Sequence, residues 1–391
     1  MSAKALRTKY SRMKIGIITL PLETNYGGLL QNYALQQILH KCGHEAYTID
    51  CKFPKNAYTS NKPYKYLLFR IRQIKRRLLG RAYCPNRSIR LKIIENCEGF
   101  IQENILLTPP AINHKEYVEI LKKYNFDALV VGSDQVWRPQ YSPNITNGFL
   151  DFIKDEKAIK RLTYAASFGE DNWEFSEKQT NECSHLAKLF DAISVREESG
   201  VMLAKKYLGV NAEHVLDPTM LLEQENYINL VERKEEKKSP GNLFCYILDK
   251  NESINRFIQD VEQKLLLKSF QVKAQNNTGM LRKGYDIKDY IVPSPTKWLR
   301  AFMDAKVVLT DSFHGCVFSI IFNKEFWVTG NKGRGNARFD SLLKQFGLEN
   351  RRIDIDKIND VDFAEPIDWE RVNSIKKEWQ EKSINFLKEN L

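Results

Sequence analysis

The chain has 391 residues, of which 42% are hydrophobic and 28% are charged; this length favours two domains, and this composition excludes a disordered chain and a fibre. The 60 Lys and Arg residues outnumber the 49 Asp and Glu residues and give a formal net charge of +11. This excess is local, because residues 51–94 contain 13 basic and no acidic residues. The rest of the chain is neutral to acidic, so the charge does not indicate a polyanion as partner of the whole protein.

Cysteine usage and the N-terminal segment indicate the compartment. Seven cysteines without a Cys-x-x-Cys pair predict neither a disulfide framework nor a zinc site, and they favour a reducing cytoplasm. The apolar run 15–22 follows basic residues, but it is short and contains Gly16 and Pro21, so we interpret it as a strand rather than a signal peptide. No apolar run approaches the ~18 residues that span a bilayer. The expected location is cytoplasmic, either free or peripheral at the inner face of the membrane.

The chain alternates predicted strands with predicted helices. Residues 13–20 are β-branched and apolar like a buried parallel strand, 29–42 have helical periodicity, and 45–50 form the next strand, which completes a βαβ unit. Further predicted strands are 127–132, 162–168, 192–196, 243–248, 270–273, 306–310 and 325–329. Further predicted helices are 90–104, 114–124, 254–267, 296–305, 316–322, 339–346 and 368–391.

This alternation predicts an α/β protein with two doubly wound, Rossmann-like domains, in which ligands bind at the carboxyl ends of strands. The polar stretch 222–242 closes with Pro240–Gly241 and indicates a boundary or surface excursion. We therefore place an N-terminal domain at 1–222, with a basic insertion at about 51–94, and a C-terminal domain at 223–391. The charged terminal helix can pack back across the first domain.

The turn after the first strand is a candidate anion site. Asn25, Gly27 and Gly28 lie in the sequence Asn-Tyr-Gly-Gly between the first strand and the first helix. Free backbone N–H groups and the helix dipole favour an anion at such a position. A tight turn that only needs glycine conformations is the alternative interpretation.

The sequence Gly-Ser-Asp-Gln-Val-Trp at 132–137 follows a strongly apolar predicted strand. Asp134, with Ser133 beside it, can accept a proton from a sugar hydroxyl, and Trp137 can stack on a pyranose ring. The alternative is a helix N-cap formed by Ser133 or Asp134, with Trp137 in the core.

Two later strand ends carry further candidates. Arg196 leaves the predicted strand 192–196, where a planar and permanently charged guanidinium suits a carboxylate or phosphate; an internal Arg–Glu ion pair is the alternative. His314 lies in Thr-Asp-Ser-Phe-His-Gly at 310–315, between a strand and an apolar helix. A histidine there can act as a general acid or base, and the helix N-terminus attracts an anion; a packed structural histidine is the alternative.

The glycine-rich loop 331–338 follows the last predicted strand and contains three cations. Such a loop can close over a phosphate, and a solvated loop is the alternative for Lys332 and Arg334. Arg338 heads the helix 339–346 and is the one expected to point inward.

In combination, these segments resemble the polysaccharide pyruvyl transferase family, in its bacterial capsule and exopolysaccharide branch. The shared motifs run in order along almost the whole chain: N-Y-G-G-x-L-Q at 25–31, G-S-D-Q-V-W at 132–137, S-F-G at 167–169, S-V-R-E at 194–197, L-D-P-T at 216–219, T-D-S-F-H-G at 310–315 and R-F-D-x-L at 338–342. The resemblance implies a glycosyltransferase B-type arrangement with an interdomain cleft. It also implies phosphoenolpyruvate as donor and a sugar of a glycan precursor as acceptor. The sequence contains no metal-ligand spacing and this reaction needs no metal, so no cofactor is expected.

The resemblance also assigns residues. Arg196 and His314 match positions associated with phosphoenolpyruvate, and Ser312 stands where better-known members have an arginine. Arg338, Arg334 or Lys332 is expected to supply the missing charge. Ser167 and Gly169, in the S-F-G motif, are assigned with Asn25, Gly27, Gly28, Ser133 and Trp137 to the acceptor and anion loops. His314 is the candidate general acid and Asp134 the candidate base.

Two other functions are alternatives to pyruvyl transfer. A nucleotide-sugar-dependent glycosyltransferase of the same fold would use Arg196, Lys332 and Arg338 to bind a diphosphate. Nucleic-acid binding is disfavoured, because the basic segment lacks an interleaved stacking platform.

Within the basic segment, an apolar series recurs at helical spacing among basic residues, at Leu67, Ile71, Ile74 and Leu78. An amphipathic helix of this kind suits an anionic membrane, where 64–92 would bring the enzyme to lipid-diphosphate-linked acceptors. A helix docked on its own domain, with solvated charges, is the alternative.

Overall fold

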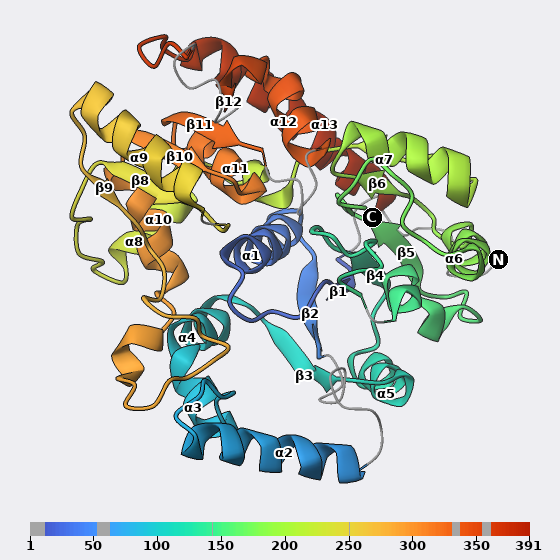
Figure 1. Ribbon diagram of the computed structural model, residues 1–391. Helices are drawn as coiled ribbons and strands as arrows, with labels where there is room; N and C mark the ends of the chain where they lie inside the picture. Colours follow the sequence, from blue (N-terminus) through green and yellow to red (C-terminus); the bar gives the residue numbers. More distant parts are fainter. Residues whose placement is uncertain (1–11, 53–62, 143, 250, 331–336, 354–360) are drawn as a thin grey trace, which may run out of the picture.

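The computed structural model describes residues 12–52, 63–142, 144–249, 251–330, 337–353 and 361–391. Two five-stranded sheets, in which every strand pairing is parallel, organise the described chain (Figure 1). The strands of the first sheet are β1 (Lys14–Ile18), β2 (Glu45–Cys51), β3 (Leu107–Ala111), β4 (Ala128–Val131) and β5 (Lys160–Thr163). Those of the second are β8 (Leu243–Tyr246), β9 (Ser269–Phe270), β10 (Val307–Thr310), β11 (Glu325–Thr329) and β12 (Arg352–Ile353). A small pair beside the first sheet consists of β6 (Ser194–Val195) and β7 (Glu213–His214).

Helices connect the parallel strands and cover the sheets (Figure 1). In the first half of the chain these are α1 (Tyr26–Lys41), α2 (Pro63–Leu78), α3 (Arg87–Ile93), α4 (Glu95–Asn104), α5 (His114–Tyr124), α6 (Glu177–Ala187) and α7 (Glu198–Leu203). In the second half they are α8 (Gln224–Glu232), α9 (Glu252–Leu265), α10 (Pro295–Asp304), α11 (Phe313–Ile321), α12 (Ala337–Phe346) and α13 (Trp369–Asn390). None of the described helices is both long and apolar enough to cross a bilayer.

The strand order confirms the predicted α/β class with two Rossmann-like sheets. The first sheet has the order β3-β2-β1-β4-β5, which reverses direction between β1 and β4. The second has the order β12-β11-β10-β8-β9, which reverses between β8 and β10. In open parallel sheets, ligands bind beyond the carboxyl ends of the strands at such reversals. Each sheet therefore offers one expected binding position.

The two halves share one core. The ring of Tyr26, at the start of α1, lies 5.5 Å from that of Trp298 in α10, and its hydroxyl donates to the carbonyl of Pro293 at 2.9 Å. As expected, the terminal helix α13 returns to the first half: Gln380 donates to the carbonyl of Met220 at 2.7 Å. These contacts fix the carboxyl edges of the two sheets relative to each other.

Three sequence predictions were wrong in detail. The edge strand β3 was missed because its sequence Leu-Thr-Pro-Pro-Ala contains two prolines, which only an edge strand tolerates. The strand predicted at 162–168 ends at Thr163, and Ala165 has a positive φ of 52°. The segment 222–242, predicted to be a boundary or a surface excursion, is not a surface excursion, because it contains α8, whose residues Tyr227 and Leu230 are buried.

Candidate active site

A cavity of about 320 Å³ lies at the two reversals of strand order. Its walls on the side of the first sheet are formed by Thr24, Asn25, Asp134, Gln135 and Tyr141. The walls on the side of the second sheet are formed by Tyr246, Leu248, Asp311, Ser312, Phe313, His314, Arg338 and Phe339. Its volume falls within the roughly 300–1,000 Å³ of small-ligand sites, and both halves of the molecule contribute to it.

Asp217 connects the charged groups behind this cavity. Its Oδ2 lies 3.0 Å from Nη1 of Arg196 and 3.6 Å from Nε2 of His314, and it accepts a hydrogen bond from Ser133 at 3.2 Å. Its Oδ1 accepts from the backbone N–H and the hydroxyl of Thr219. Burial raises the pKa of Asp217, but His314, Arg196 and Thr219 outweigh burial and hold this pKa well below its usual range. Asp217 therefore stays ionised and holds the other groups in place.

Arg196 is almost completely buried at the end of β6. Its guanidinium pairs with Asp217 and lies 3.5 Å from the carboxylate of Asp134. Burial disfavours the charged form, but the two carboxylates outweigh burial and raise the pKa of Arg196. Its Nη2 is the atom that faces Asp134, and its Nε has no hydrogen-bond acceptor among the described residues. A buried donor without an acceptor is uncommon in proteins, and a bound ligand or water is one explanation for it.

Arg338 adds a second buried guanidinium. It lines the cavity at the start of α12 and is 6% exposed. The guanidinium carbons of Arg196 and Arg338 lie 4.4 and 5.8 Å from the centroid of the same Phe313 ring. Burial lowers the pKa of Arg338 to about 10, and the charge of Arg196 acts in the same direction. The carboxylates of Asp134 and Glu197 act on this pKa in the opposite direction. The site thus has two buried guanidiniums, a type of group that binds carboxylates and phosphates.

His314 lies in the first turn of α11, whose N-terminus faces the cavity. Its imidazole faces Asp217 through Nε2 and α1 through Nδ1. A Cβ atom added to Gly27 would lie 2.0 Å from Nδ1 of His314, so only glycine permits this approach. The second half of the molecule thus places its histidine directly against the first helix of the other half.

Asp134 lines the cavity at the end of β4. Its φ of 70° is unusual for a residue other than glycine, and this conformation occurs at functional sites more than elsewhere. Its carboxylate accepts a long hydrogen bond of 3.4 Å from the side chain of Asn25. Asn25 precedes α1, which begins at Tyr26, so the turn predicted at 25–28 is already helical at Gly27 and Gly28.

Ser167 and Gly169 lie behind the cavity wall. The hydroxyl of Ser167 donates to Glu197 at 3.0 Å, and the backbone N–H groups of Phe168 and Gly169 donate to the same oxygen, Oε1. Burial raises the pKa of Glu197, although Arg196 and Arg338 act in the opposite direction. Ser167 and Gly169 therefore hold the buried Glu197 in place, and they do not line the cavity themselves.

The expectation that Trp137 stacks on a sugar ring was wrong. Its side chain is fully buried, stacks on Phe149 with centroids 4.7 Å apart, and donates from Nε1 to the carbonyl of Gly148 at 2.8 Å. The structure instead agrees with the alternative interpretation of a core tryptophan. Ser133 is also buried, and its hydroxyl serves Asp217.

Of the candidates in the second half, Ser312 lines the cavity as the residue before α11. Its neighbour Asp311 accepts the backbone N–H groups of Leu248 and Asp249, which joins the ends of β8 and β10. Lys332 and Arg334 lie outside the described residues. Among the three cations considered as replacements for an arginine at position 312, the structure places Arg338 in the cavity.

Sequence reasoning missed several residues of the site. Asp217 was not among the predicted site residues, although it belongs to the L-D-P-T motif at 216–219, which could have identified it. Phe313, Tyr141 and Tyr246 also line the site. Their apolar or aromatic character matches that of core residues, so only the tertiary structure identifies them.

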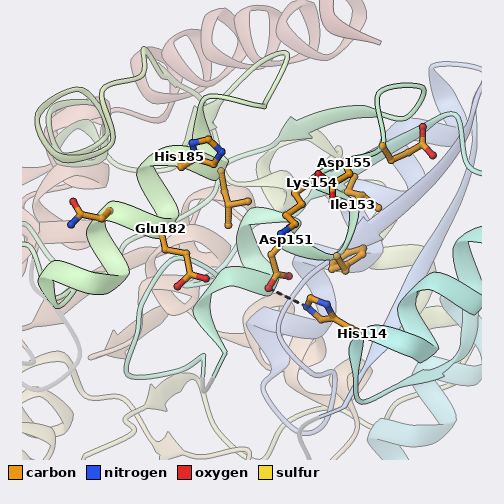
Figure 2. Close-up of a pocket in the computed structure, with 11 residues that line it drawn as sticks. His114, Asp151, Ile153, Lys154, Asp155, Glu182 and His185 are labelled. Carbon is orange, nitrogen blue, oxygen red and sulfur yellow. Dashed lines mark ion pairs between the residues drawn. The ribbon is translucent and has the colours of Figure 1, made fainter.

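A larger cavity, of about 870 Å³, lies elsewhere (Figure 2). It is bordered by α5 and α6, and His114 pairs there with Asp151 at 3.1 Å. It contains none of the predicted site residues. No group of three or more His, Cys, Asp or Glu side chains in the described part of the chain is arranged to hold a metal ion. The cavity at the strand ends is therefore the candidate site.

Similar solved structures include the spinosyn forosaminyltransferase SpnP, at 12% identity and a TM-score of 0.48, with 95% of each chain covered. UDP-GlcNAc 2-epimerase from Neisseria meningitidis matches at 10% identity and a TM-score of 0.48, with 95% of this chain and 94% of that chain covered. Similarities of this size say nothing about activity.

A comparison with curated proteins finds no match. The family model described as polysaccharide pyruvyl transferase matches residues 25–333, a range that includes Asn25, Asp134, Arg196, Asp217 and His314. The chain therefore belongs to the polysaccharide pyruvyl transferase family.

Proposed function

We propose that the protein transfers the pyruvyl group of phosphoenolpyruvate to two hydroxyls of a sugar in a glycan precursor, and releases phosphate. The precursor belongs to a capsule, an exopolysaccharide or a cell-wall polymer. The observation that carries the proposal is the pair of buried guanidiniums, Arg196 and Arg338, beside one cavity that also contains His314.

The charges of the site match this donor. Phosphoenolpyruvate carries a carboxylate and a phosphate, and planar guanidiniums bind both groups through paired hydrogen bonds. Arg338 lines the cavity directly, and Arg196 lies behind Asp134 with its Nε not bonded to any described residue. The N-terminus of α11, which starts at Phe313, adds the positive end of a helix dipole.

The reaction needs an acid and a base. A proton is added to the methylene carbon of the donor, and a first sugar hydroxyl attacks C2 and loses its proton. Phosphate then leaves with the electron pair of its C–O bond, and a second hydroxyl closes the ketal and loses its proton. His314 is the proposed acid, and the ionised Asp217 orients its ring. Asp134, at the opposite wall, is the proposed base for a sugar hydroxyl.

A direct test combines the purified protein, phosphoenolpyruvate and a panel of glycan acceptors, including lipid-diphosphate-linked sugars. We expect phosphate release that depends on the acceptor, and a product heavier than the acceptor by one pyruvate ketal in mass spectrometry. Transfer of a hexose from a nucleotide sugar, with no use of phosphoenolpyruvate, would contradict the proposal.

The close approach of Gly27 to His314 gives a prediction that depends on the site geometry. Gly27→Ala places a Cβ atom against the imidazole and must displace it, and a misplacement of about 1 Å costs about 10²-fold in rate. Activity should fall by this factor in steady-state assays. The control is Gly99→Ala in α4, where an added Cβ meets nothing within 4 Å and activity should persist. Full activity of Gly27→Ala would show that His314 need not occupy this position.

A further inference from the structure

Helix α2 presents an apolar row to solvent. Leu67, Ile71, Ile74 and Leu78 recur at helical spacing and are 61%, 53%, 57% and 78% exposed. The helix packs on the molecule with its opposite face, because Gln73 accepts the backbone N–H of Cys84 at 2.9 Å. In Figure 1, α2 lies at the outer edge of the molecule, away from both sheets. This apolar row is therefore not part of the protein core.

Basic side chains flank the row on both sides. Arg70, Arg72, Lys75 and Arg77 are exposed and lie between the apolar residues in sequence. No acidic residue occurs anywhere in 51–94, so this segment contains nothing to neutralise them. An exposed apolar row between two cationic flanks matches a surface that combines acyl chains with anionic headgroups.

We infer that α2 is an interfacial helix that docks the protein on an anionic lipid bilayer. The apolar row enters the region between headgroups and acyl chains, and the four flanking cations contact anionic headgroups. A nucleic acid would match the cations but leave the apolar row exposed, and a purely apolar protein partner would leave the cations unpaired.

The position of α2 connects it to the candidate active site. Helix α3 follows α2, and its Arg90 pairs with Glu23 at 2.8 Å. Glu23 directly precedes Thr24 and Asn25, which line the cavity. A bilayer under α2 would thus bring the site near a lipid-linked acceptor. This consequence rests on the proposed function, whereas lipid binding itself is measured without donor or acceptor.

The test is co-sedimentation of the full-length protein with vesicles of phosphatidylcholine alone, or mixed equally with phosphatidylglycerol. We expect binding to the anionic vesicles that weakens with added salt. Ile71→Ser combined with Ile74→Ser should weaken it by about 30-fold, because two apolar side chains no longer enter the bilayer. Arg70→Gln, Arg72→Gln and Lys75→Gln together should weaken it by about 100-fold, since each cation near the surface contributes about fivefold.

Matched controls change the same chemistry elsewhere. Met202→Ser with Leu266→Ser removes two apolar side chains that are 65% and 90% exposed, and binding should be unchanged. Lys122→Gln, Lys123→Gln and Lys237→Gln together remove three exposed charges, and this variant should retain most of the binding. Thermal unfolding should be the same in all variants, because every replaced side chain is exposed. Wild-type protein that stays off anionic vesicles, or an apolar-row variant that binds normally, would overturn the inference. If the wild type self-associates and the variant with Ile71→Ser and Ile74→Ser does not, the apolar row contacts a second copy of the chain, and the inference is also overturned.

Discussion

His314→Ala should lower kcat for pyruvyl transfer by about 10²–10⁴-fold, with the KM for phosphoenolpyruvate changed far less. The reason is that the imidazole is the proposed proton donor to the methylene carbon, whereas Arg196 and Arg338 supply the charge that binds the donor. Phosphate release in the steady state measures both constants. In deuterium oxide, the product of the wild type should carry a single deuterium in the methyl group of its ketal.

The control is a histidine outside the site. His185 lies in α6 and borders the large cavity of Figure 2, so His185→Ala should retain wild-type kinetics. Asp217→Asn should lower kcat as well, because the ring of His314 loses the ionised carboxylate that orients it. A His314→Ala variant with normal kcat and raised KM would assign the imidazole to donor binding and contradict its role as acid.

The strand ends of the site could be predicted from sequence. Asp134, Arg196 and His314 each follow a β-rich apolar run, and the carboxyl ends of parallel strands converge at reversals of strand order. Local sequence therefore indicates which residues reach the cavity edge. It does not show that Asp217, far from both partners in sequence, pairs with Arg196 and His314. That arrangement depends on the packing of the two sheets.

Two aromatic and apolar patterns had opposite outcomes. Trp137 was predicted to stack on a sugar, but it is a core residue. The sequence does not distinguish the two roles, because stacking on a core ring and stacking on a ligand need the same flat apolar surface. The row that contains Ile71 and Ile74 has the spacing of a core-facing helix, but it faces solvent. Periodicity shows that residues share a face, and only the neighbours of that face decide whether it is buried.

Arg338→Met should raise the dissociation constant for phosphoenolpyruvate by about 10²-fold, which corresponds to about 3 kcal/mol. The methionine fills a similar volume but removes one of two cations available to a dianionic group. Binding is measured by calorimetry without an acceptor, so the result does not depend on knowledge of the sugar. The free energy of unfolding of the ligand-free variant is measured in parallel, so that weaker donor binding is distinguished from a loss of folded protein.

Arg138→Met is the matched control, since its guanidinium is equally buried but neutralised by Glu170 at 2.7 Å and Glu174 at 2.9 Å. Loss of that guanidinium leaves two carboxylates unpaired and should cost about 3–5 kcal/mol of stability. Arg338→Met should thus weaken donor binding, whereas Arg138→Met should mainly lower the stability of the fold. Arg338→Met with unchanged donor binding and a destabilised fold would make Arg338 a structural residue, and the donor charge would then have to come from another cation.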